Sequence, residues 1–582
     1  MELSRFEMPS VGELLSLRLL GVVSVCLLAF SLPFELERPL VVIGAFRLTN
    51  VELLLFITLF LSVVIVVKER RWHHPGWLKV PISWLILLGL FGMALVVSAY
   101  LAPEFRLNAL KAAFRTVSGL ALAFALPQLF KEKGYLPFLI GSLLAGGLLS
   151  VGIGLAEIWL GQTVSVLNLF RNEPTVAGPF VRLSGSFNHA NQMAMFIEAT
   201  LPFLAATAWL IGRKGHRIMA LLGGLVLLLY LQADFLTYSR SSFVTIFLSA
   251  TIVAGLVWWW QPNKRRLAYL WGAIAGLVLL LFIVNTLINP VLRLRLSSEG
   301  DNEWYNASFV VPEQLELEAG NTIPVTITVS NEGSLYWSSQ GETPINLGGH
   351  WYRVSDDARS DNEARWSLDQ NVAPGESLQM TVMLTAPNEA GEYQFEWDLV
   401  QEGVVWFSLR NGRHFTSYVT VLGAVGTPTV EREPDTFSNA RPTAHPIPNR
   451  RVLWSIAARQ FLERSLLGIG LDNFRLTYGE VMGWQSWNNS IHTNNWYIET
   501  VVSVGLLGSV PFFSWLVLLG LGLLDRIRRS RVNIWQIALI CGLLAYLIHG
   551  LLDYFLLFNG TGLLFWIFVG MWMVLAWSKP SA

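Results

Sequence analysis

One histidine stands out as a side chain that could move a proton, His492 in the polar run 490–499. Imidazole is the side chain best suited to accept a proton near neutral pH. Asn494 and Asn495 follow it and could hold or support an acceptor group. A histidine in a purely structural role is the competing interpretation of this run.

Four arginines lie beside apolar segments and could bind an anion: Arg182, Arg240, Arg451 and Arg459. Guanidinium stays charged and offers paired donors, which suits phosphate. Arg451 and Arg459 are about two helical turns apart, so they face the same general side of an amphipathic helix over 450–464. Arginines that only reach toward lipid headgroups are the alternative.

Two asparagines, Asn188 and Asn191, precede an apolar run in a segment that also contains Arg182. Either asparagine could cap the helix that follows. A helix N-terminus beside an arginine also favours an anion. We therefore treat both as possible acceptor or supporting groups, with simple capping as the alternative.

Four ionisable side chains fall inside or at the end of apolar runs: Glu198, Asp234, His549 and Asp553. His549 and Asp553 are four residues apart, so we expect them to pair on one helix face. Structural pairing is the first interpretation of all four, and a role at the acceptor site is the second.

The elements that must position these residues are membrane helices. Hydrophobic residues make up 53% of the 582 residues and charged residues only 14%, against about 25% in soluble domains. This composition excludes a disordered protein, a fibrous protein and an ordinary cytosolic enzyme. Segments of about 20 apolar residues can cross a bilayer. Twelve are predicted: 14–33, 48–67, 81–101, 108–129, 135–160, 190–211, 217–236, 241–260, 267–289, 498–524, 534–556 and 561–578.

The charges of the short loops predict an orientation. With the N-terminus in the cytoplasm, cytoplasmic segments carry 18 Lys and Arg residues and the short outer loops carry six. This agrees with the positive-inside rule. Both termini are then cytoplasmic, and residues 290–497 are extracytoplasmic, on the outer side of the plasma membrane. The balanced total of 41 basic and 41 acidic residues does not support nucleic-acid binding.

A polar insert interrupts the apolar segments. Residues 301–422 contain 18 acidic residues and five arginines. Alternating β-branched and aromatic runs, separated by turn residues, predict an all-β sandwich. The segments 344–352 and 402–407 resemble immunoglobulin-like modules of bacterial cell-surface glycan proteins. The chain has only two cysteines, Cys26 and Cys541, so no disulfide framework supports this insert.

The predicted architecture is a polytopic α-helical membrane protein of about twelve transmembrane helices with an inserted extracytoplasmic β-sandwich. Its expected parts are a membrane domain with nine spans (1–296), the sandwich (297–425), a Pro-rich linker (426–449), an outer catalytic loop with an amphipathic helix (450–497), and three final spans (498–582).

Taken together, the polar segments resemble the O-antigen ligase and O-antigen polymerase family. The points of similarity are residues 185–191, the Ser239-Arg240 step, Arg451 followed by 466–474, and 492–508. Many family members have a histidine where this chain has Asn494. His492 stands two residues before that position.

This resemblance implies a membrane-embedded glycosyltransferase of the C-type class in the bacterial plasma membrane. Such enzymes move a glycan from undecaprenyl pyrophosphate to a hydroxyl of a lipid, glycan or protein acceptor. Carried over to this chain, Arg182, Arg240 and Arg451 or Arg459 hold the pyrophosphate, and His492 is the base. No metal or other cofactor is expected, and the other partners are membrane lipids.

Three alternatives remain open from the sequence. The first is a repeat-unit polysaccharide polymerase or a protein O-glycan ligase. The second is a transporter of lipid-linked glycan, although no internal repeat of the kind found in transporters is evident. The third is an envelope scaffold that displays the sandwich, for which twelve spans are more than an anchor needs.

Overall fold

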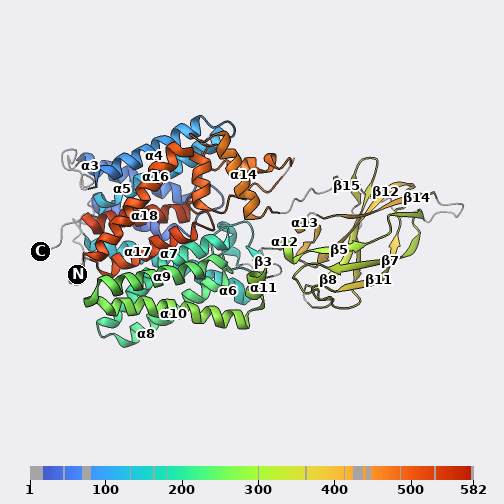
Figure 1. The fold of residues 1–582 in the computed structure, drawn as a ribbon, viewed down its shortest axis with the longest axis horizontal. Helices are drawn as coiled ribbons and strands as arrows, with labels where there is room; N and C mark the ends of the chain where they lie inside the picture. The colour runs from blue at the N-terminus through green and yellow to red at the C-terminus, as the bar shows by residue number, and fades with distance from the viewer. Residues whose placement is uncertain are drawn as a thin grey trace.

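The chain folds into a helical bundle and a β-sandwich, which lie end to end in Figure 1. The computed structural model describes residues 17–43, 46–68, 80–130, 133–161, 164–177, 180–298, 301–341, 343–360, 363–411, 413–423, 437–440, 447–484, 487–529 and 532–577. Residues 14–16 of the first predicted span, and most of the predicted linker, lie outside this described part.

Each of the twelve predicted apolar segments contains a helix. The helices are α2 (Leu17–Ser31), α3 (Asn50–Lys68), α4 (Ile82–Tyr100), α5 (Arg106–Leu129), α6 (Leu136–Leu160), α7 (Ala190–Arg213), α8 (Arg217–Leu236), α9 (Arg240–Trp260), α10 (Arg265–Ile288), α16 (Trp496–Arg528), α17 (Ile534–His549) and α18 (Asn559–Trp577). Among the described residues, ten apolar helices have the length and composition to cross a membrane, and α2 and α17 are shorter.

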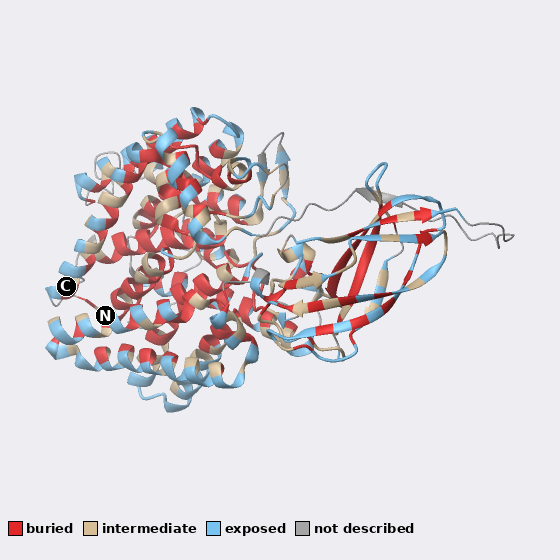
Figure 2. Cartoon of the chain, turned by 45° about the vertical axis from the view of Figure 1, so that its right-hand side comes forward, coloured by how far each residue is buried: buried red, intermediate tan, exposed pale blue. Residues whose placement is uncertain are grey.

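The bundle has a buried centre and an apolar outer surface. Helix α18 is almost wholly enclosed and packs against α5, α7 and α17. Figure 2 shows buried residues concentrated in the middle of the bundle, while its outer helices are largely exposed. Leu221 on α8 and Leu280 on α10 are 74% and 56% exposed. Such a continuous apolar exterior is rare on monomeric soluble proteins.

One predicted span ends earlier than expected. The apolar pattern extends to residue 556, but α17 stops at His549 and residues 550–558 form a turn before α18. Asn495 and Arg450 donate hydrogen bonds to the carbonyl oxygens of Leu551 and Leu552. These two carbonyls therefore bind side chains of another segment instead of continuing the helical ladder.

The insert is a two-sheet sandwich. Strands β5 (Ala307–Val310), β7 (Thr322–Asn331) and β11 (Ser377–Thr385) form the smaller sheet in the order β11-β7-β5. The larger sheet has the path β15-β9-β8-β12-β14-β6, with β10 paired to β8 and β13 to β12. Its strands are β6 (Gln314–Glu318), β8 (Ile345–Arg353), β9 (Ala358–Ser360), β10 (Ala364–Ser367), β12 (Gly391–Gln401), β13 (Val405–Trp406), β14 (Phe415–Leu422) and β15 (Phe437–Ala440).

The core of the sandwich follows from the alternation in its strands. Along β11, Leu378, Met380, Val382 and Leu384 are buried while the residues between them are exposed. The aromatic residues of β12, such as Trp397, are buried as well. Strand β15 comes from within the predicted linker and pairs with β9, so this part of the linker belongs to the larger sheet.

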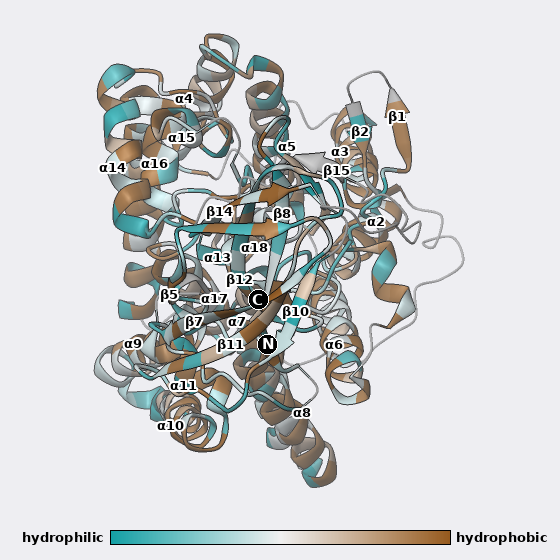
Figure 3. Ribbon diagram, turned by 90° about the vertical axis from the view of Figure 1, so that its right-hand side faces the viewer, coloured by the Kyte–Doolittle hydropathy of each residue, from teal (hydrophilic) through white to brown (hydrophobic). Residues whose placement is uncertain are grey.

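Short elements gather at the end of the bundle that faces the sandwich. They include β1 (Val41–Ile43), β2 (Phe46–Leu48), β3 (Val176–Ala177), β4 (Phe180–Val181), α11 (Pro290–Ser297), α12 (Asp301–Trp304), α14 (Arg450–Glu463) and α15 (Phe474–Val481), while α13 (Ser408–Asn411) lies in the sandwich. Figure 3, viewed from the sandwich, shows α14 and α15 beside α4 and α16.

Candidate functional site

A cavity of about 410 Å³ lies at the sandwich-facing end of the bundle. Two residues predicted from the sequence, His492 and Asn188, line it. Side chains that were not predicted also contribute to its wall: Glu35, Glu37, Thr49, Arg115, Asp472, Arg475 and Asn559. The cavity therefore joins one proton-accepting group with two guanidinium groups and several carboxylates.

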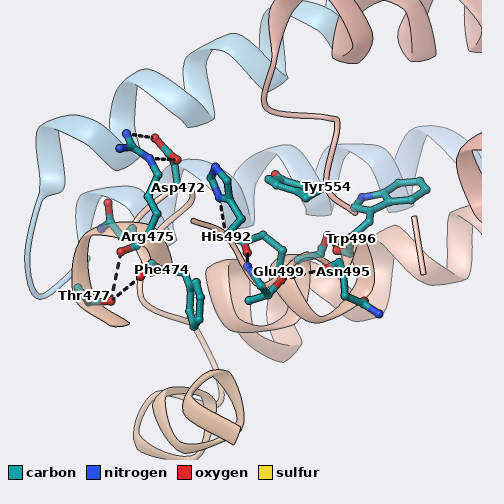
Figure 4. Close-up of polar contacts among 12 residues, drawn as sticks. Asp472, Phe474, Arg475, Thr477, His492, Asn495, Trp496, Glu499 and Tyr554 are labelled. Carbon is teal, nitrogen blue, oxygen red and sulfur yellow. Dashed lines mark hydrogen bonds and ion pairs between the residues drawn. The ribbon is translucent and has the colours of Figure 1, made fainter. Parts of the chain in front are cut away.

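His492 is paired with a glutamate at the beginning of α16. Its Nδ1 lies 3.6 Å from Oε1 of Glu499, and the amide of Thr493 donates to Oε2 of the same carboxylate at 2.9 Å. Figure 4 shows the ring standing between this carboxylate, Arg475 and Tyr554. Glu499 is fully buried, whereas His492 reaches the cavity. This arrangement orients the imidazole and leaves it access to a bound molecule.

The charges around His492 favour its protonated form. Burial lowers the pKa of His492, but hydrogen bonding and charge from Glu499, together with the charge of Asp472, raise it by more, so the pKa lies above the ordinary 6.5. Arg475 opposes this shift more weakly. A base with a raised pKa becomes available at higher pH than an ordinary histidine, or after substrate changes its surroundings.

Close backbone packing holds the loop that leads to His492. Helix α16 is interrupted at Gly505, where φ is 58° and ψ is −164°. The segment 465–470 pairs with this break through Ile469 N to Val502 O and Leu506 N to Ser465 O. A Cβ at Gly505 would lie 2.4 Å from the carbonyl of Leu466, so only glycine fits. The glycine at position 505 therefore allows the segment 465–470 to pack against α16.

An arginine–carboxylate pair continues from that loop. Arg475 donates from Nε to Oδ1 of Asp472 at 2.6 Å and from Nη2 to Oδ2 at 2.8 Å. Asn108 on α5 donates to the same carboxylate, and Arg475 also donates to the carbonyl of Asn489. Such a two-point pair is rigid. It ties the segment before His492 to α5.

A second arginine of the cavity, Arg115, makes fewer hydrogen bonds to the described residues than Arg475 does. Nε of Arg115 lies 2.7 Å from Oε1 of Glu52, and 44% of the Arg115 side chain is exposed. Glu35 lies in the same cavity and accepts hydrogen bonds from Thr49 and Asn559. Burial raises the pKa of Glu35 above its usual value. Arg115 thus lines the cavity as a cation, and within the described part of the chain its Nε alone has a hydrogen-bond partner.

The structure brings Arg182 and Asn191 together, in a network separate from the cavity lining. Arg182 is buried and donates to the carbonyl of Thr237 and to Oδ1 of Asn191. Asn191 in turn donates to Asp553 at 2.8 Å. Since Tyr554 contacts the His492 ring at 5.7 Å between centroids, this network lies next to the cavity.

The other predicted arginines point elsewhere. Arg240 donates to the carbonyls of Arg295 and Ser298. It therefore connects the start of α9 to the end of α11, which precedes the sandwich in the chain. Arg451 and Arg459 are exposed on α14, where Arg459 is 3.4 Å from Glu463. None of these three predicted arginines lines the cavity.

The two asparagines after His492 shape the backbone. Asn494 adopts a left-handed conformation with φ of 51°, which asparagine tolerates better than most residues. Asn495 caps α16 by accepting from the amide of Ile498, and its own amide donates to Leu551. Neither asparagine lines the cavity in which an acceptor group was expected: the side chain of Asn495 caps α16, and the backbone of Asn494 forms the turn before it.

A second histidine lies in a closed network between α7, α9 and α17. Nε2 of His549 is 2.6 Å from Oγ of Ser241, and Nδ1 is 2.8 Å from Oε1 of Glu198. All three are buried, and none lines the cavity. The expected pair between His549 and Asp553 does not form, because α17 ends at His549 and Asp553 turns toward Asn191.

Comparison with known families concerns the sandwich. Residues 310–410 match the family described as the Ig-like domain from next to BRCA1 gene. No curated protein matches the chain. The matched family identifies an immunoglobulin-like fold for the insert, in agreement with the sandwich predicted from alternation. It carries no information about the helical part.

Sequence reasoning did not single out Arg115, Glu35 or Glu499. A weak signal existed for Glu499, which is the acidic residue in the first turn of the helix that follows His492. Asp472 and Arg475 lie in or beside the segment 466–474 that carried the family resemblance, but without an assigned role. Among the described residues, no group of three or more His, Cys, Asp or Glu side chains is arranged to hold a metal ion.

Proposed function

We propose that this protein is a membrane glycosyltransferase that moves a glycan from undecaprenyl pyrophosphate to an acceptor hydroxyl. Its apolar helices would cross the bacterial plasma membrane, with both termini cytoplasmic and the sandwich outside. The observation that carries the proposal is the cavity at the sandwich-facing end, where His492 meets Glu499 and two arginines. A base beside fixed positive charges suits transfer from a diphosphate donor.

In this reaction His492 takes the proton of the acceptor hydroxyl. The acceptor oxygen then attacks the anomeric carbon of the donor, and the bond from that carbon to the pyrophosphate oxygen breaks. Undecaprenyl pyrophosphate leaves with the bonding electron pair. Attack from the side opposite the leaving group inverts the anomeric centre, so a product with retained configuration would contradict this mechanism.

Arg115 is the side chain that we assign to the pyrophosphate. It lines the cavity with His492, is partly exposed, and carries a guanidinium group, which suits phosphate. Arg475 also lines the cavity, but its pair with Asp472 suits it to holding the loop. Arg182, adjacent through Asn191 and Asp553, is proposed to support the same region rather than to meet the donor directly.

The position of the buried polar groups favours an enzyme over a transporter. Glu198 lies only eight residues, about 12 Å, from the beginning of α7. Asp234 is near the end of α8, and His549 is the last residue of α17. These groups gather at one end of the bundle. A transport path would need polar groups near the middle of the membrane.

Transfer by the purified protein tests the proposal. The full chain in detergent or nanodiscs is given a lipid-linked glycan donor with lipid, glycan and protein acceptors, and the products are separated by size. One glycan added per acceptor indicates a ligase, and a ladder of repeats indicates a polymerase. No transfer to any acceptor, with movement of the lipid-linked glycan across liposomes, would overturn the proposal in favour of a transporter.

A further inference from the structure

One strand of the sandwich has a free edge that is long and regular. Strand β11 is the last strand of the smaller sheet, and it pairs with β7 over nine consecutive residues without a bulge. Its end borders a cavity of about 360 Å³, which lies between it and β10 of the larger sheet. Among the main-chain hydrogen bonds between described residues, none joins Ser377–Thr385 to a segment other than β7. Another strand could therefore pair with this edge.

The hydrogen bonds at the two ends of β11 show which backbone groups point to the free edge. The amide of Asn331 donates to the carbonyl of Glu376, just before β11. The amide of Ala386, just after β11, donates to the carbonyl of Asn321. Both contacts turn even-numbered positions toward β7, and the backbone groups of an antiparallel strand alternate between its two sides. The odd-numbered residues, with Thr381 at the centre, therefore direct their amides and carbonyls to the free edge.

Among the described strands, the other edges of the sandwich are short or charged. Strands β5, β10 and β15 have four residues each. Strand β6 has five residues, which include Glu316 and Glu318. Short edge strands and charged side chains are the usual means by which sheets avoid pairing with another chain. Ser377–Thr385 lacks both, because it is about 30 Å long and contains no charged residue and no proline.

The sequence of β11 is nearly symmetric about its centre. When two copies of the strand are placed antiparallel around Thr381, this residue meets its own copy. On the buried face, leucine then meets leucine and methionine meets valine, in the pairs Leu378–Leu384 and Met380–Val382. Apolar side chains thus lie beside apolar side chains in both directions. This self-complementarity favours a second copy of the strand over an unrelated extended segment.

We propose that β11 pairs with β11 of a second copy of this chain, antiparallel and centred on Thr381. Residues 301–422 contain 18 acidic residues against five arginines, so two sandwiches repel each other. A contact strand without charge keeps this repulsion small at the interface. About ten main-chain hydrogen bonds would join the two smaller sheets. This association goes beyond the proposed transfer reaction and does not depend on it.

Charged variants at Thr381 test the proposal. The full chain in detergent, without donor or acceptor, is followed by sedimentation velocity over a concentration series. We expect the wild type to dimerise. Thr381→Lys and Thr381→Glu should each raise the dissociation constant about threefold or more, because like charges then lie opposite each other. A mixture of the two variants, carrying different tags, should form a heterodimer with a dissociation constant within about twofold of wild type.

Thr326→Lys is the matched control. The hydroxyls of Thr326 and Thr381 share a hydrogen bond of 2.9 Å, so both lysine variants lose the same contact, but Thr326 lies on β7, one strand away from the edge. It should change the dissociation constant less than twofold. The proposal is overturned if the wild type is monomeric, or if Thr381→Lys and Thr381→Glu alone dimerise as tightly as wild type. An equal effect of Thr326→Lys, or a mixture that fails to restore pairing, would also overturn it.

Discussion

Two histidines of this chain each pair with a glutamate, yet their surroundings differ. His492 lies 3.6 Å from Glu499 and lines a cavity. His549 lies 2.8 Å from Glu198, bonds to Ser241 as well, and is wholly enclosed by α7, α9 and α17. The enclosed trio has the closer contacts and resembles a nucleophile–base–acid set.

The comparison shows what distinguishes a candidate base from a structural histidine. The deciding feature is whether a bound molecule can reach the imidazole ring, and not how short the distance between histidine and glutamate is. A saturated and enclosed imidazole has no open position for a substrate. Its hydrogen bonds instead join three helices, which a buried polar network does well when every member is satisfied. The looser pair at His492 instead lies in the wall of the cavity, where a bound molecule could reach the ring.

Replacement of His492 should produce the largest effect on activity. Without a general base we expect His492→Ala to lower the transfer rate by about 10²- to 10⁴-fold. Some loss of stability is also expected, because the ring packs against Tyr554 and Phe558 and pairs with the buried Glu499, so rates are compared per folded molecule. Initial rates at saturating donor provide the measurement. A variant that retains more than a tenth of wild-type activity would remove His492 from the role of base.

Replacement of His549 should act on stability. His549→Ala leaves Glu198 and Ser241 buried without this partner, which costs about 3 kcal/mol of unfolding free energy. Reversible unfolding in mixed micelles measures this loss. The rate per folded molecule should stay within about threefold of wild type. If stability were unchanged while activity fell a hundredfold, the two histidines would have exchanged roles.

The arginines allow a second comparison, between a side chain that lines the cavity and one that is exposed away from it. Arg115→Gln should raise the KM for the lipid-linked donor about tenfold to a hundredfold, since a charged hydrogen bond to phosphate is lost. Arg459→Gln, on the exposed face of α14 beside Glu463, is the matched control and should change KM less than threefold. Similar effects from both would indicate a general loss of attraction to anionic lipid.

The smallest effect concerns pH. Because the pKa of His492 is raised, its ion pair with Glu499 stabilises the protein at low pH and is lost as pH rises through that pKa. The neutral base appears over the same interval, so kcat/KM should rise with pH at higher pH than for a histidine of ordinary pKa. Glu499→Gln removes the raising charge and should move this rise to lower pH. The pH profile of His549→Ala should keep the wild-type position.

Much of the architecture could be predicted from local pattern. Runs of apolar residues produced all twelve helix positions, and alternation along 377–385 produced the buried face of β11. The apolar pattern gave a wrong prediction at 550–556: it predicts that Leu551 and Leu552 continue the helix, but α17 ends at His549. There, side chains from Asn495 and Arg450 bind the carbonyls that the helix would need.

The candidate site was predicted only in part, for a physical reason. His492 could be found from the sequence, because imidazole is the usual proton acceptor wherever it occurs. The sequence alone likewise determined the apolar helices, the alternating strands and the acidic insert, since each depends on neighbouring residues. Which charges meet is decided by packing between distant segments. Arg115 lines the cavity that contains His492 only because the folded helices place it there. For the same reason, Arg240 binds the carbonyls of Arg295 and Ser298.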